Sequence, residues 1–391
     1  MRRSGLSAFT KFVGVLLVTG LFVGQAVAQE IKVGAVQPIT GRFAFAGVMI
    51  NAGLEDALMI ANNEGGINGK KIKYIMEDGE YKLDVATAAF KRIMSRDNPM
   101  IMYGESTGLG KAMAPEIKDR YKCLYSSTSF SGELADYKAN PYIFVPGPTY
   151  ADMFGILLNF IAKEKPGAKV AFFYSDTEFG KDPIPEAREM CKKLKLDLVA
   201  EAVAAVGAVD VTSQVLTLKG KNPDYVIFQG FVMDPVATVI KQCRDFGIQC
   251  KFMGTFWGAT KPLLDNLGPL AEGYLVVNPY MYWWNEDVPM IKKIREYTAK
   301  KYPDVKFRDN SYFQGFITGL IFVECLKRAD KAGQLNGEGL VKALESLKDF
   351  ETGGLSAPLT IKNNKFPVAR IWKSNVQKKI YEPVSDWMRL E

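Results

Sequence analysis

The chain has 391 residues, which is too long for one ordinary hydrophobic core, so we expect two domains. Hydrophobic residues make up 48% and charged residues 24%, as in ordinary soluble globular proteins. The 50 basic and 43 acidic residues are dispersed, so neither a nucleic-acid-binding patch nor a membrane-binding helix is indicated. No histidine is present, which excludes hydrolases that use a histidine base, and we expect no metal site.

The N-terminus predicts a cleavable signal peptide. A basic segment ends at Lys11, the apolar run 12–24 follows, and Ala26-Val27-Ala28 fits the small-residue cleavage rule. As a helix the run would span only about 20 Å, short of the ~30 Å hydrocarbon core of a membrane. We therefore assign residues 1–28 to the signal peptide and expect an exported, soluble mature chain. No cysteine follows the cleavage site, so we expect no lipid anchor.

Strand-like and helix-like segments alternate along the mature chain, which predicts βαβ units and parallel sheets, an α/β fold. The segment Pro146-Gly147-Pro148 is the best boundary between two lobes. The expected strands are 31–36, 72–76, 100–103, 123–125, 142–145, 170–174, 225–228, 251–253 and 274–277. The expected helices are 47–63, 83–95, 150–163, 184–195, 235–246, 288–302 and 311–328.

One loop contains a motif typical of serine hydrolases. Residues 104–108 read Gly-Glu-Ser-Thr-Gly and match G-x-S-x-G after a strand and before a helix. Ser106 would need a base, and only Lys111 is near in sequence, with nothing to lower its pKa. The alternative is that the Ser106 hydroxyl acts at the N-terminus of a helix, either as a cap or as a ligand for an anion.

The loops that follow the expected strands hold the candidate binding residues, because ligands of open parallel sheets bind beyond the carboxyl ends of the strands. Some of these loops are rich in hydroxyls and others in aromatic rings. There is no G-x-G-x-x-G after the first strand and no P-loop, so we expect no nucleotide or other cofactor. Of five cysteines, only Cys243 and Cys250 are close in sequence, and they form a possible disulfide.

Several segments together carry a resemblance to a known family. The longest reads EGGINGKKIKYIMED from Glu64 to Asp78, and shorter ones lie at 38–41, 179–180, 252–254 and 271–273. In order and spacing, residues from about 30 to about 375 resemble the type I periplasmic substrate-binding proteins of ABC importers, in the branch that binds branched-chain amino acids.

The resemblance implies two Rossmann-like lobes joined by three crossovers, near 146–148, 276–278 and 357–361. Lobe 1 would comprise 29–147 and 278–357, and lobe 2 would comprise 148–277 and 358–391. It further implies a monomer in the periplasm that closes on a small-molecule ligand by a hinge motion and delivers it to a membrane permease. No reaction would be catalysed. An exported sensor that regulates a partner protein is the alternative.

The resemblance also implies site residues. The family's serine at the loop of Ser106, with the N–H groups of the following helix, would hold a ligand carboxylate. Thr107 would supply a second hydroxyl. In the next loop the family's ligand contacts correspond to Thr128, Ser129 and Phe130.

One departure from the family pattern suggests the kind of ligand. Amino-acid binders have an acid for the ligand's ammonium after the strand that ends at Gly254, where this chain has Phe256 instead. A buried ammonium without a carboxylate is unfavourable, so we hypothesise an aromatic or branched apolar carboxylate without an α-ammonium. Asp176 or Glu178 could still replace the missing acid, which keeps hydrophobic amino acids open, and Arg42 could pair with a ligand charge. The residues expected around the apolar part are Phe43, Phe45, Tyr150, Phe179, Phe231, Phe256 and Trp257.

Overall fold

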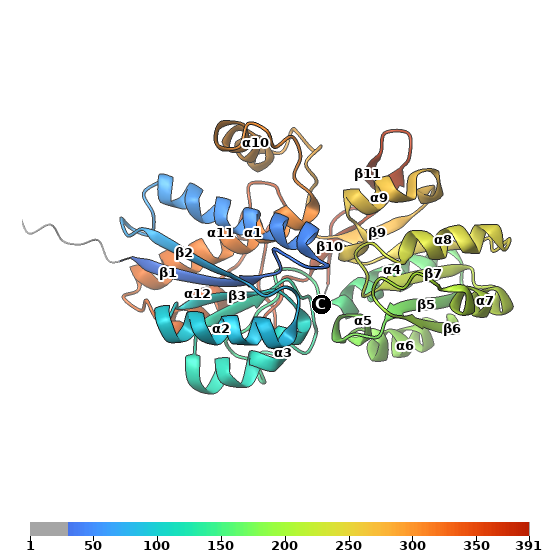
Figure 1. The fold of residues 1–391 in the computed structure, drawn as a ribbon, viewed down its shortest axis with the longest axis horizontal. Helices are drawn as coiled ribbons and strands as arrows, with labels where there is room; N and C mark the ends of the chain where they lie inside the picture. Colours follow the sequence, from blue (N-terminus) through green and yellow to red (C-terminus); the bar gives the residue numbers. More distant parts are fainter. Residues whose placement is uncertain (1–29, 391) are drawn as a thin grey trace, which may run out of the picture.

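The computed structural model describes residues 30–390, and the predicted signal peptide lies outside them. Two separate sheets form the centres of two bodies, which we call lobe 1 and lobe 2 (Figure 1). The sheet of lobe 1 has four strands in the order β2-β1-β3-β4, all parallel. The sheet of lobe 2 has eight strands in the order β11-β10-β9-β8-β7-β5-β6, with β12 paired to β10. The α/β class with parallel sheets flanked by helices is confirmed.

Lobe 1 is built from the N-terminal part of the described chain and a second, later segment. Its first part comprises β1 (Ile31–Gln37), α1 (Ala44–Asn63), β2 (Ile72–Asp78), α2 (Leu83–Asp97), β3 (Ile101–Gly104), α3 (Thr107–Glu116), a π-helical turn at Ile117–Tyr121, and β4 (Leu124–Ser127). Its second part comprises α10 (Pro289–Lys301), α11 (Asn310–Lys331) and α12 (Gly337–Glu345). Helix α1 ends at Asn63, and Gly65 and Gly66 follow it. The N–H of Gly66 donates to the carbonyl of Ala61, and the φ of Gly66 is +71°. A left-handed residue after a helix favours glycine.

Lobe 2 contains α4 (Tyr150–Glu164), β5 (Lys169–Ser175), α5 (Glu178–Lys181), α6 (Ile184–Lys193), β6 (Asp197–Ala204), α7 (Thr212–Lys221), β7 (Tyr225–Gln229), α8 (Val236–Asp245), β8 (Lys251–Gly254), α9 (Lys261–Leu267) and β9 (Leu275–Asn278). Short 3-10 turns lie at Phe256–Gly258 and Gly268–Ala271, and the antiparallel strands β10 (Val368–Asn375), β11 (Ile380–Pro383) and β12 (Met388–Arg389) complete the sheet. A capping box starts α4: Thr149 Oγ1 accepts from Asp152 N at 3.1 Å, and Asp152 Oδ2 accepts from Thr149 N at 2.8 Å.

The chain passes between the two lobes after β4, after β9 and again before β10, so each lobe combines segments far apart in sequence (Figure 1). The strand expected at 142–145 is not a strand here, because only one isolated bridge joins Tyr125 and Ile143. Two backbone hydrogen bonds join the segment to Tyr125, and its next groups bond a later segment: Val145 N donates to the carbonyl of Asn364, and Asn364 Nδ2 donates to the carbonyl of Ile143.

Helices α1 and α11 form the centre of lobe 1. A Cβ added at Gly53 would lie 2.0 Å from the carbonyl oxygen of Tyr312, and one added at Gly315 would lie 2.1 Å from that of Ile50, so the backbones are in close contact. Asp56 is fully buried between the helices, where it accepts from Tyr312 Oη at 2.9 Å and pairs with Arg308 Nη2 at 3.3 Å. By length and composition α1 alone among residues 30–390 could cross a membrane, but more than half of it is buried inside this lobe.

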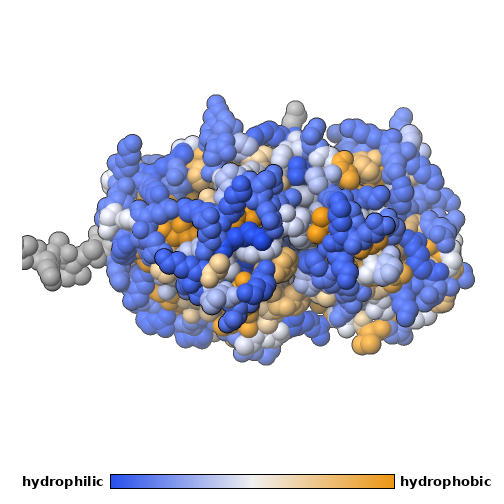
Figure 2. Space-filling model, turned by 90° about the horizontal axis from the view of Figure 1, so that it is seen from above, coloured by the Kyte–Doolittle hydropathy of each residue, from blue (hydrophilic) through white to orange (hydrophobic). Residues whose placement is uncertain are grey.

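The surface seen from above is mainly hydrophilic, with apolar residues in small scattered groups (Figure 2). That face therefore shows no broad apolar area.

Candidate ligand-binding site

A pocket lies where the carboxyl ends of both sheets face each other. It encloses about 370 Å³ of empty space, its open mouth included. Loops that follow β1, β2, β3 and β4 supply one wall, and loops that follow β5, β7 and β8 supply the other. The lining residues are Pro38, Phe43, Ala46, Gly47, Ile50, Tyr81, Glu105, Ser106, Thr107, Thr128, Ser129, Tyr150, Phe179, Val232 and Trp257.

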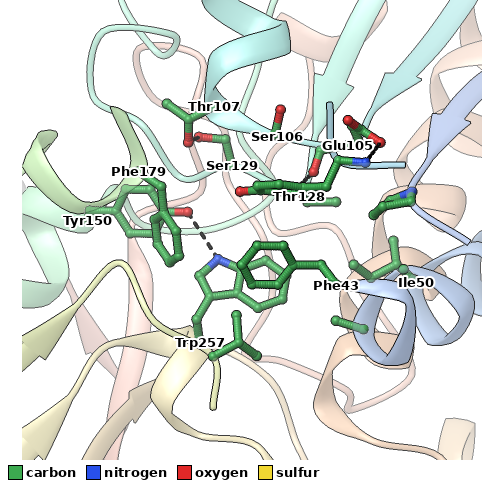
Figure 3. Close-up of a pocket in the computed structure, with 15 residues that line it drawn as sticks. Phe43, Ile50, Glu105, Ser106, Thr107, Thr128, Ser129, Tyr150, Phe179 and Trp257 are labelled. Atoms are coloured by element: carbon green, nitrogen blue, oxygen red, sulfur yellow. Dashed lines mark hydrogen bonds between the residues drawn. The ribbon is translucent and has the colours of Figure 1, made fainter. Parts of the chain in front are cut away.

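Hydroxyl groups gather at the N-terminus of α3 on the lobe 1 wall (Figure 3). Ser106 is the N-cap, and its Oγ accepts from Leu109 N at 3.1 Å. Thr107 Oγ1 and Ser129 Oγ are 2.7 Å apart, and Thr128 Oγ1 donates to the Glu105 carbonyl at 2.5 Å. The unpaired N–H groups of a first helical turn, together with hydroxyl donors, favour an anion. This end of the pocket suits a carboxylate.

Aromatic rings form the facing wall (Figure 3). Trp257 Nε1 donates to Tyr150 Oη at 3.0 Å, which fixes both rings. The Phe179 ring lies 5.2 Å from that of Tyr150 and 6.3 Å from that of Trp257, measured between centroids. Phe43 of lobe 1 packs against Tyr81 with ring planes tilted by 50° and centroids 4.2 Å apart. These rings give an apolar surface suited to a branched or aromatic group.

Sequence reasoning missed one acid in the pocket. Glu105 follows β3 directly, lines the pocket, and is 2% exposed. Burial raises the pKa of its carboxyl to about 7; the N–H of Tyr81 opposes this rise, and the nearby carboxylates of Asp78 and Glu80 add to it. The sequence offers only its position directly after an expected strand as a signal, and Asp176, which directly follows β5, shows that such an acid can equally be exposed.

Polar contacts join the two lobes beside the pocket. Lys111 Nζ of α3 lies 2.9 Å from a carboxylate oxygen of Glu178 in lobe 2. It also lies 2.7 Å from one of Glu133, in the loop after β4. Asp182 of lobe 2 accepts from the Ser131 hydroxyl and, at 3.2 Å, from Gly132 N. Burial raises the pKa of Asp182 to about 6, although these hydrogen bonds oppose the rise. The lobes are therefore held together around the pocket.

These contacts also bear on the hydrolase alternative. Burial would lower the pKa of Lys111, but its hydrogen bonds to Glu133 and Glu178 outweigh that effect and raise it. A proton-accepting lysine needs the opposite shift, and the hydroxyl of Ser106 is instead engaged with the N–H of Leu109.

The structure brings eight of the twelve expected binding residues to the pocket: Ser106, Thr107, Thr128, Ser129, Phe43, Tyr150, Phe179 and Trp257. It corrects the prediction for the other four. Phe130 and Phe256 are fully buried behind the lining, with ring centroids 5.0 Å apart. Phe231 packs on Phe173 in the core of lobe 2, 5.7 Å between centroids. Phe45 is 41% exposed on the outer side of α1.

Three further expectations are corrected. Asp176 and Glu178 do not reach the pocket, because their exposed carboxylates pair with Lys181 and Lys111. Cys243 and Cys250 are buried free thiols, so the possible disulfide is not formed. Arg244 holds the turn between them by donating to the carbonyls of Ile248 and Cys250 at 2.8 and 2.9 Å. The Arg42 guanidinium donates across the cleft to the carbonyl of Val206 rather than lining the pocket.

Comparison with known proteins agrees with this geometry. Residues 30–379 match the sequence profile of the family described as periplasmic binding protein. The chain belongs to this family. The matched range spans nearly all the described residues and both lobes, so this periplasmic binding protein has its pocket between two lobes of the matched fold.

Similar proteins include the Leu/Ile/Val-binding protein of Escherichia coli strain K12, 25% identical over 301 residues that cover 72% of this chain and 76% of that protein. The Leu/Ile/Val-binding protein homolog 7 of Brucella suis is 24% identical over 355 residues, 86% of each chain. Among solved structures, a branched-chain amino acid ABC transporter protein from Thermus thermophilus with bound valine has a TM-score of 0.84 at 23% identity, covering 93% of this chain and 97% of that one. A fatty acid ABC transporter substrate-binding protein from Thermomonospora curvata has a TM-score of 0.79 at 21% identity, covering 93% of each chain.

Proposed function

We propose that this periplasmic binding protein is the monomeric solute receptor of an ABC importer. It binds a small carboxylate with an apolar body, either a branched or aromatic acid or a hydrophobic amino acid, between its two lobes. Hinge closure encloses the ligand, and the closed protein delivers it to the membrane permease. No covalent step is involved. Ser106 and the start of α3 bind the carboxylate, and the rings of Tyr150, Phe179 and Trp257 contact the apolar body.

The observation that carries the proposal is the division of the pocket into two surfaces of different chemistry. The lobe 1 wall offers hydroxyls and a helix N-terminus, and the lobe 2 wall offers rings. A ligand that touches both walls at once stabilises the closed arrangement, because its binding energy is then shared between the lobes. The contacts that Lys111 and Asp182 make across the cleft also stabilise the closed arrangement.

Similarity of fold does not decide which carboxylate is bound. The fold is shared by a protein solved with valine and by a protein named for fatty acids. The names of the sequence relatives favour branched-chain amino acids, and this is the reason that leucine belongs in any ligand test. The aromatic wall and the lack of an acid after β8 favour acids without an amine, whereas the buried acid Glu105 on the lobe 1 wall keeps hydrophobic amino acids as the second candidate.

The experiment is a ligand screen by thermal shift followed by calorimetry, because a ligand that binds only the native state raises its stability. L-leucine, 4-methylpentanoate and 2-hydroxy-4-methylpentanoate share one carbon skeleton and differ only at the α-carbon. Phenylalanine and 3-phenylpropanoate form a second matched pair. At least one of these acids should raise the melting temperature in a saturable way, and 4-methylpentanamide, which lacks the carboxylate, should not. Equal shifts with the acid and the amide would contradict the proposed carboxylate site.

A further inference from the structure

Glu105 is a buried carboxyl group with no cationic partner. Among residues 30–390, no lysine or arginine nitrogen lies within salt-bridge distance of it. Its Oε2 accepts one hydrogen bond, from Tyr81 N at 3.3 Å, and the same oxygen would lie 2.2 Å from a Cβ placed on Gly79. An ionised carboxylate in such surroundings is poorly compensated.

The groups that face Glu105 add no positive charge. Asp78, at the end of β2, accepts hydrogen bonds from the Thr40 hydroxyl, from backbone N–H groups of the loop after β1, and from Glu80 N of its own loop. Glu80 pairs with Lys82, whose side chain is 63% exposed. Tyr81 and Tyr125 also face the carboxyl, and burial is the main cause that raises the pKa of both phenols, so they remain neutral. Glu105 thus lies between two acids and two neutral phenols.

The carboxyl of Glu105 and the hydroxyl of Ser106 rise from the same wall of the pocket (Figure 3). Both residues line the same pocket. A carboxylate bound at Ser106 therefore brings a second negative charge into the pocket that Glu105 lines. Repulsion between two carboxylates that share a site disfavours the state in which both are ionised, so the weaker acid takes up a proton.

We propose that Glu105 takes up one proton from solvent when the pocket binds an amine-free carboxylate, so that the anion enters beside a neutral carboxyl group. This inference rests on the proposed function and deepens it. No bond to the ligand forms or breaks, and the proton returns to solvent on release. A ligand with an α-ammonium would have the opposite effect, because the cation favours the ionised form of Glu105. This side chain therefore distinguishes amine-free acids from amino acids.

The affinity for an amine-free acid should depend on pH through Glu105. The protonated form of Glu105 is the form that accepts the anion, and its pKa in the free protein is raised to about 7. Binding of an amine-free acid, itself ionised throughout this range, should tighten as the pH falls. Between about pH 8 and about pH 6 the protonated fraction rises about tenfold for a pKa of about 7, so the affinity should rise by the same factor.

The test is calorimetry of 4-methylpentanoate binding at about pH 7, in buffers of low and high ionisation enthalpy. The difference in heat should report about half a proton taken up per ligand, because about half of the free protein is already protonated at that pH. The variant Glu105→Gln keeps the size of the side chain and cannot ionise. Its binding should show no proton uptake and a flat pH profile, with a melting temperature that confirms folding. Glu189→Gln, in an exposed acid paired with Lys192 on α6, is the matched control and should behave as the wild type.

The outcomes separate the two proposals. Binding of 4-methylpentanoate without proton uptake, or an unchanged pH profile in Glu105→Gln, would overturn the role of Glu105 and leave the proposed function in place. If L-leucine alone among the five acids binds, the role of Glu105 is also overturned and the proposed function also stands. If none of them binds, the proposed function itself fails.

Discussion

Replacing Ser106 with alanine separates the two roles that its hydroxyl can have. In the structure the hydroxyl oxygen caps α3 through Leu109 N at 3.1 Å, and loss of such a cap costs about 0.5–2 kcal/mol of stability. If the hydroxyl also donates to a ligand carboxylate, a hydrogen bond to a charged group worth about 1.5–3 kcal/mol is lost as well. At about 1.4 kcal/mol for each tenfold change, the dissociation constant should rise roughly 10- to 150-fold.

Both quantities can be measured on the same variant. Urea denaturation without ligand gives the loss of the cap, and calorimetry with the best acid from the screen gives the loss of affinity. Ser106→Thr is the control, because threonine is also an accepted N-cap residue and keeps a hydroxyl at this place. Reduced stability with an unchanged dissociation constant would show that the serine only caps the helix, and the proposed carboxylate site would then be wrong.

Three further changes test the fold and the pocket. Arg308→Met removes the closer and more buried of the two cations at Asp56, while Lys301 Nζ stays 3.7 Å away, so it should lower the free energy of unfolding by up to about 3–5 kcal/mol, measured in urea, with Arg308→Lys less harmful; a loss below about 1 kcal/mol would refute the importance of the Arg308–Asp56 pair. Gly53→Ala drives a methyl group against the carbonyl of Tyr312 and should cost about 1–3 kcal/mol or more, so unchanged stability would mean that the helices do not touch there. Trp257→Phe should remove most of the ligand-dependent change in tryptophan fluorescence, since the other four tryptophans lie outside the pocket lining, and a full signal in that variant would place the ligand elsewhere.

Much of the fold could be predicted because buried parallel strands are continuous apolar runs. The strand at 170–174 and the helix at 83–95 differ from β5 and α2 by at most two residues at either end. Strand β6 was missed because it reads DLVAEAVA: it is a partly exposed edge strand, and its alanines favour a helix by propensity. Strand β10 was missed because it pairs in antiparallel manner after the last crossover, outside the βαβ repeat.

The site was predicted less completely than the fold. Loop position after a strand was enough to find Ser106 and Thr128, because the topology brings those loops to one edge. The type of a residue does not reveal which neighbours bury it, and this is why Phe231 was placed in the pocket although it packs on Phe173. The same limit hid Glu105, since an acid in a loop is usually solvated and its burial depends on the 79–81 loop of another βα unit.

The interleaving of the two lobes has a consequence for biogenesis. Helix α1 packs against α11, which is completed only at Lys331, and the lobe 2 sheet lacks β10 until Asn375 has been made. Neither half can therefore reach its final form while the chain is still short, and contacts of such long sequence separation form slowly. Completion of either lobe therefore depends on segments that are among the last to be synthesised.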